Sequence, residues 1–186
     1  MFLCEEEFFS IEECERIADL VLSREEEVLK IPNTNTRTDY TGLTGKYYDF
    51  NWLPWIVEEL EIDVPNRLLS LELFQNYNTL WVQCWSNVLR QGEGLNMHNH
   101  GNDGEINDFL PAHVFIAGNP NTGTYYKELN ITMPSTRGNL HIFNPFDEHK
   151  VVLNTHSTPR ISLAMDIWYT LHELPNIYEI HRNPLS

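Results

Sequence analysis

Hydrophobic residues in the N-terminal segment recur with the spacing of a helix. Ile17, Leu20 and Val21 fit a 3.6-residue period, so they lie on one face of such a helix. Ser10 is a favourable N-cap residue, and Glu13 three residues later completes the sequence pattern of a capping box. The pattern therefore predicts a helix that begins after Ser10 and packs on the rest of the domain.

The pattern changes from residue 67 onward. Short apolar runs alternate with Gly, Pro and Asn, and no helical period separates them. We expect strands at 68–74, 80–89, 112–117, 124–129, 140–143, 150–153 and 160–169. Many short strands of this kind favour a sandwich or jelly roll over a parallel α/β sheet.

The prediction is a single mainly β domain over residues 1–186. Residues 1–66 form N-terminal helices and loops, with a second helix near 52–60, and residues 67–170 form a jelly-roll core. The tail, residues 171–186, could be either a last helical turn or a packed strand.

Composition excludes several classes of protein. The 186 residues, 41% of them hydrophobic, suffice for one domain with a core. With 12 basic and 27 acidic residues the formal charge is −15, which would repel nucleic-acid backbones and anionic membranes. We find no apolar run long enough for a membrane span and no secretory signal. Cys4, Cys14 and Cys84 form no C-x-x-C pair, so we expect reduced thiols and a cytoplasmic protein.

Three histidines are candidate metal ligands. On a strand, His98 and His100 would project from the same face. The pair alone is weak evidence for a metal site, because the number of H-x-H pairs expected by chance in a chain with this many histidines is roughly a third. His149 opens a later predicted strand, and a jelly roll packs distant strands against each other. The alternatives are solvent-facing histidines in a loop and a histidine that caps a strand.

The last predicted core strand carries a cation on its second face. One face is apolar, and the other presents Arg160, Ser162 and Ala164. Arg can clamp a carboxylate through two charge-assisted hydrogen bonds, Ser adds a donor, and Ala leaves room. Because a buried Arg without an anion is costly, we expect an acidic ligand or partner there. The alternative is a surface Arg on an edge strand.

Together these features resemble the iron(II)- and 2-oxoglutarate-dependent oxygenases. Residues 138–151 are similar to that family's G-x-L-x-x-F-P-x-x-x-x-H-x-V stretch, with Asn144 as one extra residue, and residues 159–164 resemble its R-x-S clamp. Residues 85–98 resemble the approach strand of an oxygenase subgroup that carries H-x-H in place of H-x-D. The helix at 8–22 is similar to the one before the core in prolyl-hydroxylase-like members.

This resemblance covers about residues 80–168 and implies a double-stranded β-helix fold with N-terminal flanking helices. It also implies an oxidoreductase: a dioxygenase that uses Fe(II) and 2-oxoglutarate to hydroxylate a substrate, with release of succinate and CO2. Arg160 and Ser162 would bind the distal carboxylate of 2-oxoglutarate, and Asn87 would contact the co-substrate from a neighbouring strand. No catalytic residue beyond the metal centre is expected.

The implied metal ligands are His98, His100 and His149. The family's usual carboxylate ligand is absent, which leaves the iron one unit more positive than in a site with Asp or Glu. Asp103 is the alternative to His100 as third ligand. Imidazole also binds zinc and copper, so the sequence does not determine the native metal.

We expect the substrate to be a small molecule or a peptide, and the resemblance of the first helix to prolyl hydroxylases favours a peptide or protein. The acidic composition favours a basic or neutral partner. Two other functions stay open: a cupin-like metal enzyme that acts without 2-oxoglutarate, and a jelly-roll binding module with a structural metal. A structural zinc would be four-coordinate and closed. Whether the chain forms a homo-oligomer also stays open.

Overall fold

The computed structural model describes residues 3–34, 41–101, 108–170 and 176–182. The helices are α1 Ile11–Leu29, α2 Leu53–Glu58 and α3 Val64–Ser70, with two 3-10 helices, η1 Gly42–Lys46 and η2 Glu72–Phe74. The strands are β1 Cys4–Glu7, β2 Thr79–Leu89, β3 Leu95–His98, β4 Phe109–Ala117, β5 Thr124–Tyr126, β6 Ile131–Met133, β7 Asn139–Ile142, β8 His149–Val151, β9 Arg160–Trp168 and β10 Tyr178–His181.

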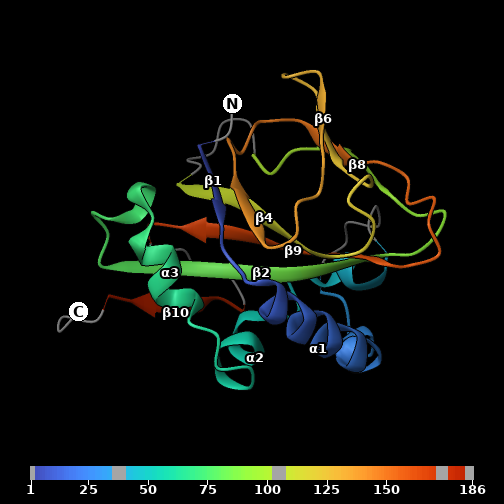
Figure 1. Cartoon of the computed structure of the whole chain (residues 1–186). Helices are drawn as coiled ribbons and strands as arrows, with labels where there is room; N and C mark the ends of the chain where they lie inside the picture. The colour runs from blue at the N-terminus through green and yellow to red at the C-terminus, as the bar shows by residue number, and fades with distance from the viewer. Residues whose placement is uncertain (1–2, 35–40, 102–107, 171–175, 183–186) are drawn as a thin grey trace.

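The strands form two antiparallel sheets. The six-stranded sheet has the order β1-β7-β4-β9-β2-β10, and the four-stranded sheet has the order β3-β8-β5-β6. Figure 1 shows α1 and α2 beneath the large sheet, with β6 and β8 of the small sheet above it. This arrangement confirms the prediction of a mainly β fold flanked by N-terminal helices.

One predicted strand is wrong. Residues 68–74 belong to α3 and η2 rather than to the sheet. Asp63 caps α3 by accepting a hydrogen bond from the Asn66 amide, and Pro65 lies in the first turn, where its missing N–H does no harm. A short apolar run is compatible with either structure, and here the start signal at Asp63 and Pro65 decides for a helix.

The hydrophobic core lies between the helices and the lower face of the large sheet. Buried residues of α1, including Ile17 and Val21, belong to the same cluster as every second residue of β9. The β9 members of this cluster are Ile161, Leu163, Met165 and Ile167. The predicted alternation along this strand is therefore confirmed, and its opposite face is free to build a site between the sheets.

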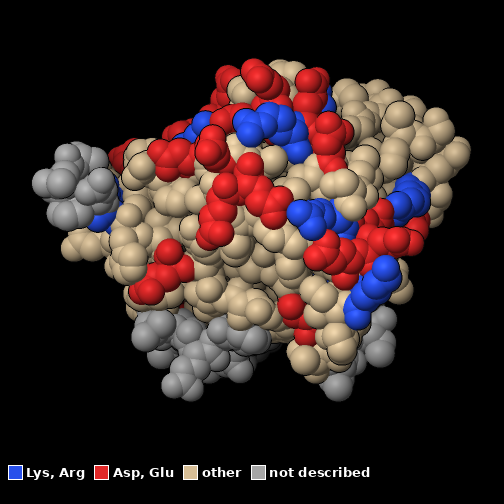
Figure 2. All heavy atoms as spheres, turned by 90° about the horizontal axis from the view of Figure 1, so that it is seen from below, with Lys and Arg blue, Asp and Glu red and all other residues tan. Residues whose placement is uncertain are grey.

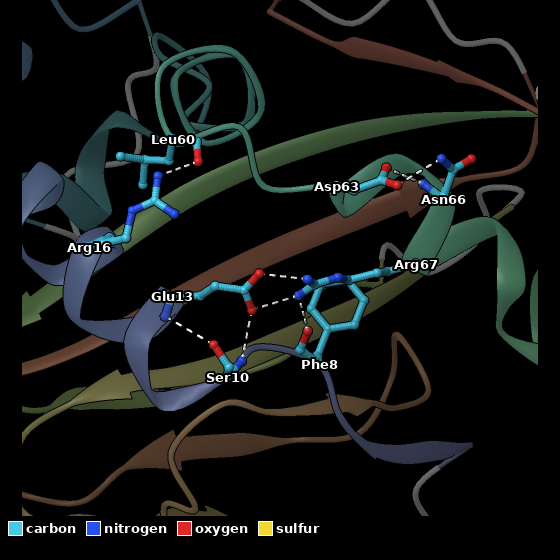
Figure 3. A network of polar contacts seen from close by, with 8 residues as sticks. All are labelled: Phe8, Ser10, Glu13, Arg16, Leu60, Asp63, Asn66 and Arg67. Carbon is cyan, nitrogen blue, oxygen red and sulfur yellow. Dashed lines mark hydrogen bonds and ion pairs between the residues drawn. The ribbon is translucent and has the colours of Figure 1, made fainter.

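A polar network holds the start of α1 against α3 (Figure 3). The capping box is present: Ser10 Oγ accepts from the Glu13 amide, and the Glu13 carboxylate accepts from the Ser10 amide. Both Glu13 oxygens also accept from Arg67 of α3, at 2.9 and 2.6 Å, and Arg67 donates to the Phe8 carbonyl at 2.6 Å. Arg67 therefore ties the two helices together through a bidentate ion pair.

Replacing Arg67 with Ala should destabilise the fold by about 1–2 kcal/mol, because charge-assisted bonds at a partly exposed position are lost. The hydrogen bonds from Arg67 lower the pKa of Glu13 below its ordinary value of 4.5. A carboxyl with a lowered folded pKa adds stability above its unfolded pKa and loses it as the pH falls through the folded pKa. The difference between wild type and R67A, measured by urea unfolding, should therefore shrink below about pH 4. A constant difference down to pH 2 would contradict this account.

Acidic side chains outnumber basic ones on the face on which the helices lie. Figure 2 views this face from below and shows more Asp and Glu than Lys and Arg. Helix α1 alone contains the run Glu25, Glu26 and Glu27. Within the described residues, no helix is both long enough and apolar enough to cross a bilayer.

Candidate functional site

Three histidines meet between the two sheets. His98 ends β3 and His149 begins β8, and the two face each other in the antiparallel register. His100 follows shortly after, and its backbone amide donates to the Pro145 carbonyl, at 2.9 Å, which holds it near the turn before β8. Their candidate ligand atoms all lie within 4.8 Å of one another. The structure thus brings together the three histidines predicted as ligands, whereas Asp103, the alternative, lies outside the described residues.

The ring orientation of His98 and His149 is fixed by local hydrogen bonds. His98 Nδ1 lies 2.8 Å from the Asn96 carbonyl oxygen, and His149 Nδ1 lies 3.0 Å from the Asp147 carbonyl oxygen. A carbonyl only accepts, so each Nδ1 carries the proton and each Nε2 keeps its lone pair. Metal-binding histidines are typically oriented in this way.

The third ring, His100, has a charged partner. Its Nδ1 lies 2.8 Å from Oδ1 of Asp166 on β9. Trp85 stacks beside the ring with centroids 5.8 Å apart, and Phe143 meets it edge-on at the same distance. Distant parts of the chain therefore fix this ring, and they leave its Nε2 available.

Burial keeps the imidazoles of His98 and His149 neutral. It lowers the pKa of His98 to about 4, and it lowers the pKa of His149 below its ordinary value, with the neighbouring rings adding to the effect. At neutral pH both rings are therefore unprotonated at Nε2, as metal ligation requires. Three imidazole ligands fit Fe(II), zinc or copper.

Arg160 lies in the same cavity and is buried. Only 1% of its surface is exposed. Its Nε donates to the Thr122 carbonyl at 3.0 Å, and its Nη1 donates to Ser162 Oγ at 2.9 Å. Its Nη2 lies 3.5 Å from Thr124 Oγ1. Within the described ranges no carboxylate pairs with this guanidinium, and burial lowers its pKa to about 10, which leaves it charged at neutral pH.

The cavity between the sheets joins these groups. It has a volume of about 130 Å³ and is lined by the three histidines and by Arg160, Ser162 and Asn87, among others. Asn87 lies on β2 opposite Ser162 of β9, and its Nδ2 is 3.5 Å from the Ser162 hydroxyl. The buried Oδ1 of Asn87 has no hydrogen-bond partner among the described residues. A bound molecule that spans the cavity could therefore meet the histidines, a guanidinium, a hydroxyl and an amide.

Other residues of the cavity wall were not predicted. Asp166 continues the inward face of β9 two residues beyond Ala164, so the same period of two could have found it. His113 of β4 faces the cavity as well, but a lone histidine in an apolar strand carries no such signal. Tyr47 and Tyr48, which follow η1, also line the cavity.

Comparison with other proteins detects similarity in structure only. No family model matches the chain, and no curated protein matches its sequence. A viral collagen prolyl hydroxylase from Paramecium bursaria chlorella virus 1, solved as a 2-oxoglutarate complex, aligns with a TM-score of 0.58 at 12% identity, over 91% of this chain and 97% of the viral one. The non-heme monooxygenase ThoJ, in a nickel complex, aligns with a TM-score of 0.63 at 13% identity, over 98% and 80%.

A third similar structure is CytC3 with Fe(II) and α-ketoglutarate. It aligns with a TM-score of 0.56 at 15% identity and covers 92% of this chain and 76% of its own. At such low identities the similarity defines the fold. The chain has the jelly-roll, prolyl-hydroxylase-like fold that the sequence predicted.

Proposed function

We propose that this protein is an Fe(II)- and 2-oxoglutarate-dependent dioxygenase that hydroxylates a substrate and releases succinate and CO2. The observation that carries the proposal is a buried guanidinium, Arg160, that has no carboxylate partner in the described chain and shares one cavity with three clustered histidines. A buried cation needs an anion, and a dicarboxylate would reach from Arg160 toward a metal.

The cavity residues form two binding sites, one for the metal and one for the distal carboxylate of the co-substrate. His98, His100 and His149 would hold Fe(II), which supplies the activation of O2 when it is bound. Arg160 and Ser162 would bind the distal carboxylate of 2-oxoglutarate and so orient the keto acid toward the histidines. Asn87, next to Ser162, would accept or donate a hydrogen bond along the co-substrate.

Similar structures support this reading. The viral collagen prolyl hydroxylase was solved as a 2-oxoglutarate complex, and CytC3 was solved with Fe(II) and α-ketoglutarate. The prolyl hydroxylases among the similar folds favour a peptide substrate over a small molecule. The free thiols of Cys4, Cys14 and Cys84 agree with a reducing, cytoplasmic setting.

The alternatives fit the cavity less well. A structural zinc site needs four protein ligands, and the described residues supply a group of three. A cupin-like enzyme that acts without 2-oxoglutarate would explain the histidines, but it gives no reason for an unpaired cation beside them. Both alternatives remain outcomes of the test below.

The test begins without oxygen. Addition of Fe(II) and 2-oxoglutarate to the purified protein should produce the weak visible charge-transfer band of a metal-bound keto acid. Admission of O2 should then yield succinate, even without the natural substrate, through slow uncoupled turnover. If the protein binds Fe(II) but shows neither band nor succinate, the proposal fails in favour of a binding module or a different metal enzyme.

A further inference from the structure

The three histidines of the candidate metal site differ in the group that accepts a hydrogen bond from Nδ1. His98 and His149 each donate to a neutral backbone carbonyl two residues earlier in the chain. His100 donates to the Asp166 carboxylate, 66 residues away in sequence. Only this third ring, among the three, therefore has a negative charge behind it.

The fold builds this contact with several elements. Asp166 lies on β9 between Gln83 of β2 and Pro111 of β4, in the middle of the large sheet. Its side chain points into the cavity, like those of Arg160 and Ser162 on the same strand. Strand β9 therefore carries both Arg160, the cation proposed to bind the co-substrate, and Asp166, the anion that contacts His100.

Solvent hardly screens the contact. The side chains of His100 and Asp166 are only 10% and 14% exposed. The contact with Trp85 described above covers the ring on one side. Among the described residues, His100 is the only hydrogen-bond or ion-pair partner of the Asp166 carboxylate. A charge-assisted bond in such surroundings is stronger than one in water.

We propose that Asp166 is a positioning residue that supplies, through His100, the negative charge missing from an all-histidine metal site. This inference rests on the metal site of the proposed function. A site with two histidines and a carboxylate has one negative charge on its ligands, whereas three neutral imidazoles have none. An Asp166 carboxylate bonded to Nδ1–H of His100 restores this charge one ring away from the metal, raises the basicity of Nε2 and fixes the tautomer.

Metal affinity tests the proposal without any need for turnover. Titration with Co(II), which resists oxidation, gives a dissociation constant and a visible spectrum for the wild type, D166N and E179Q. Glu179 lies on β10 in the same sheet, is exposed, and does not line the cavity. E179Q therefore removes one negative charge at a position away from the metal site. We expect D166N to bind Co(II) about 10- to 100-fold more weakly, with a changed spectrum, and E179Q to match the wild type. Equal affinity and equal spectra for D166N and the wild type would overturn the proposal.

A double-mutant cycle separates action through His100 from direct ligation. If Asp166 acts through the ring, D166N should have almost no further effect in an H100A background. If Asp166 itself binds the metal, D166N should weaken binding in both backgrounds, and the positioning role is then wrong.

A measurement on the wild type covers the case in which D166N does not fold. In the Zn(II)-loaded protein, the Nδ1 proton of His100 should resonate clearly downfield of those of His98 and His149 in the proton NMR spectrum, because only it donates to a carboxylate. Three similar shifts would overturn the proposal.

The two proposals can fail separately. Co(II) binding needs neither 2-oxoglutarate nor O2, so a protein that makes no succinate but shows the D166N effect retains this inference. Conversely, if the wild type forms succinate and D166N binds Co(II) with wild-type affinity, only the positioning role of Asp166 is wrong. A wild type that binds no Co(II) would overturn both.

Discussion

Replacement of Arg160 by Met should abolish 2-oxoglutarate-dependent succinate formation without loss of the fold. Arg160 is the only guanidinium that lines the cavity within the described chain, and its two nitrogens nearest Ser162 and Thr124 are placed for a carboxylate. Loss of two charge-assisted hydrogen bonds removes at least about 3 kcal/mol of binding, or more than about 100-fold in Kd. The measurement is 2-oxoglutarate binding to the Fe(II)-loaded protein without oxygen, followed by a succinate assay.

The same substitution should leave stability unchanged or increase it. Met fills a similar volume, and removal of an unpaired buried charge relieves its desolvation penalty. The Thr122 carbonyl that Arg160 contacts keeps a second donor, the Ser135 hydroxyl at 2.9 Å. A higher or equal melting temperature together with lost co-substrate binding would show that this cation serves a ligand rather than the fold.

R160K provides the matched control. Lys keeps the charge but cannot form the bidentate contact, so we expect intermediate binding. If R160M still turns over 2-oxoglutarate, the clamp is assigned to the wrong residue. If R160M instead unfolds, the guanidinium is structural, and the case for a dicarboxylate is lost.

Sequence reasoning worked best where a strand has one buried apolar face. Residues 160–167 alternate strictly, and both the core face and the cavity face of β9 followed from that alternation. The capping box of Ser10 and Glu13 was equally legible, because it depends on residues three apart.

Strand prediction from the sequence failed where a strand has no apolar face. Strand β3, Leu95–His98, is half-exposed or exposed throughout and exists because it pairs with β8. Strand β1 is an edge strand of mostly glutamates, held by its pairing with β7. Strand β10, in the tail whose structure stayed open, pairs with β2. Such strands are specified by their partners, which a single sequence does not show.

The candidate site was predicted for a different reason. Its residues lie on β2, β8 and β9 and at and just after the end of β3, and they were identified by the chemistry of histidine and arginine and by a family resemblance. Their convergence required the fold. The period of two along β9 places Asp166 on the cavity face, but its role depends on His100, 66 residues away in sequence, and only the fold shows that contact.

Replacement of His149 by Ala should weaken metal binding severely and abolish oxidative turnover. His149 is buried at 5% exposure, its Nδ1 is fixed by the Asp147 carbonyl, and its ring lies 4.3 Å from that of His98. Removal of one of three ligands leaves two imidazoles and solvent, which should weaken Co(II) binding by more than the 10- to 100-fold typical of a supporting residue. The measurement is the same Co(II) titration, with H181A as the control.

His181 is an exposed histidine on β10 outside the cavity, so H181A should bind Co(II) like the wild type. H149A and R160M should then fail in different ways: the first binds the metal much more weakly, whereas the second keeps its metal affinity and loses 2-oxoglutarate. An H149A protein that retains wild-type Co(II) affinity would place the metal elsewhere and remove the basis for the oxygenase. If R160M also loses its affinity for Co(II), Arg160 supports the histidine site itself. The separate roles proposed for Arg160 and for the three histidines would then be wrong.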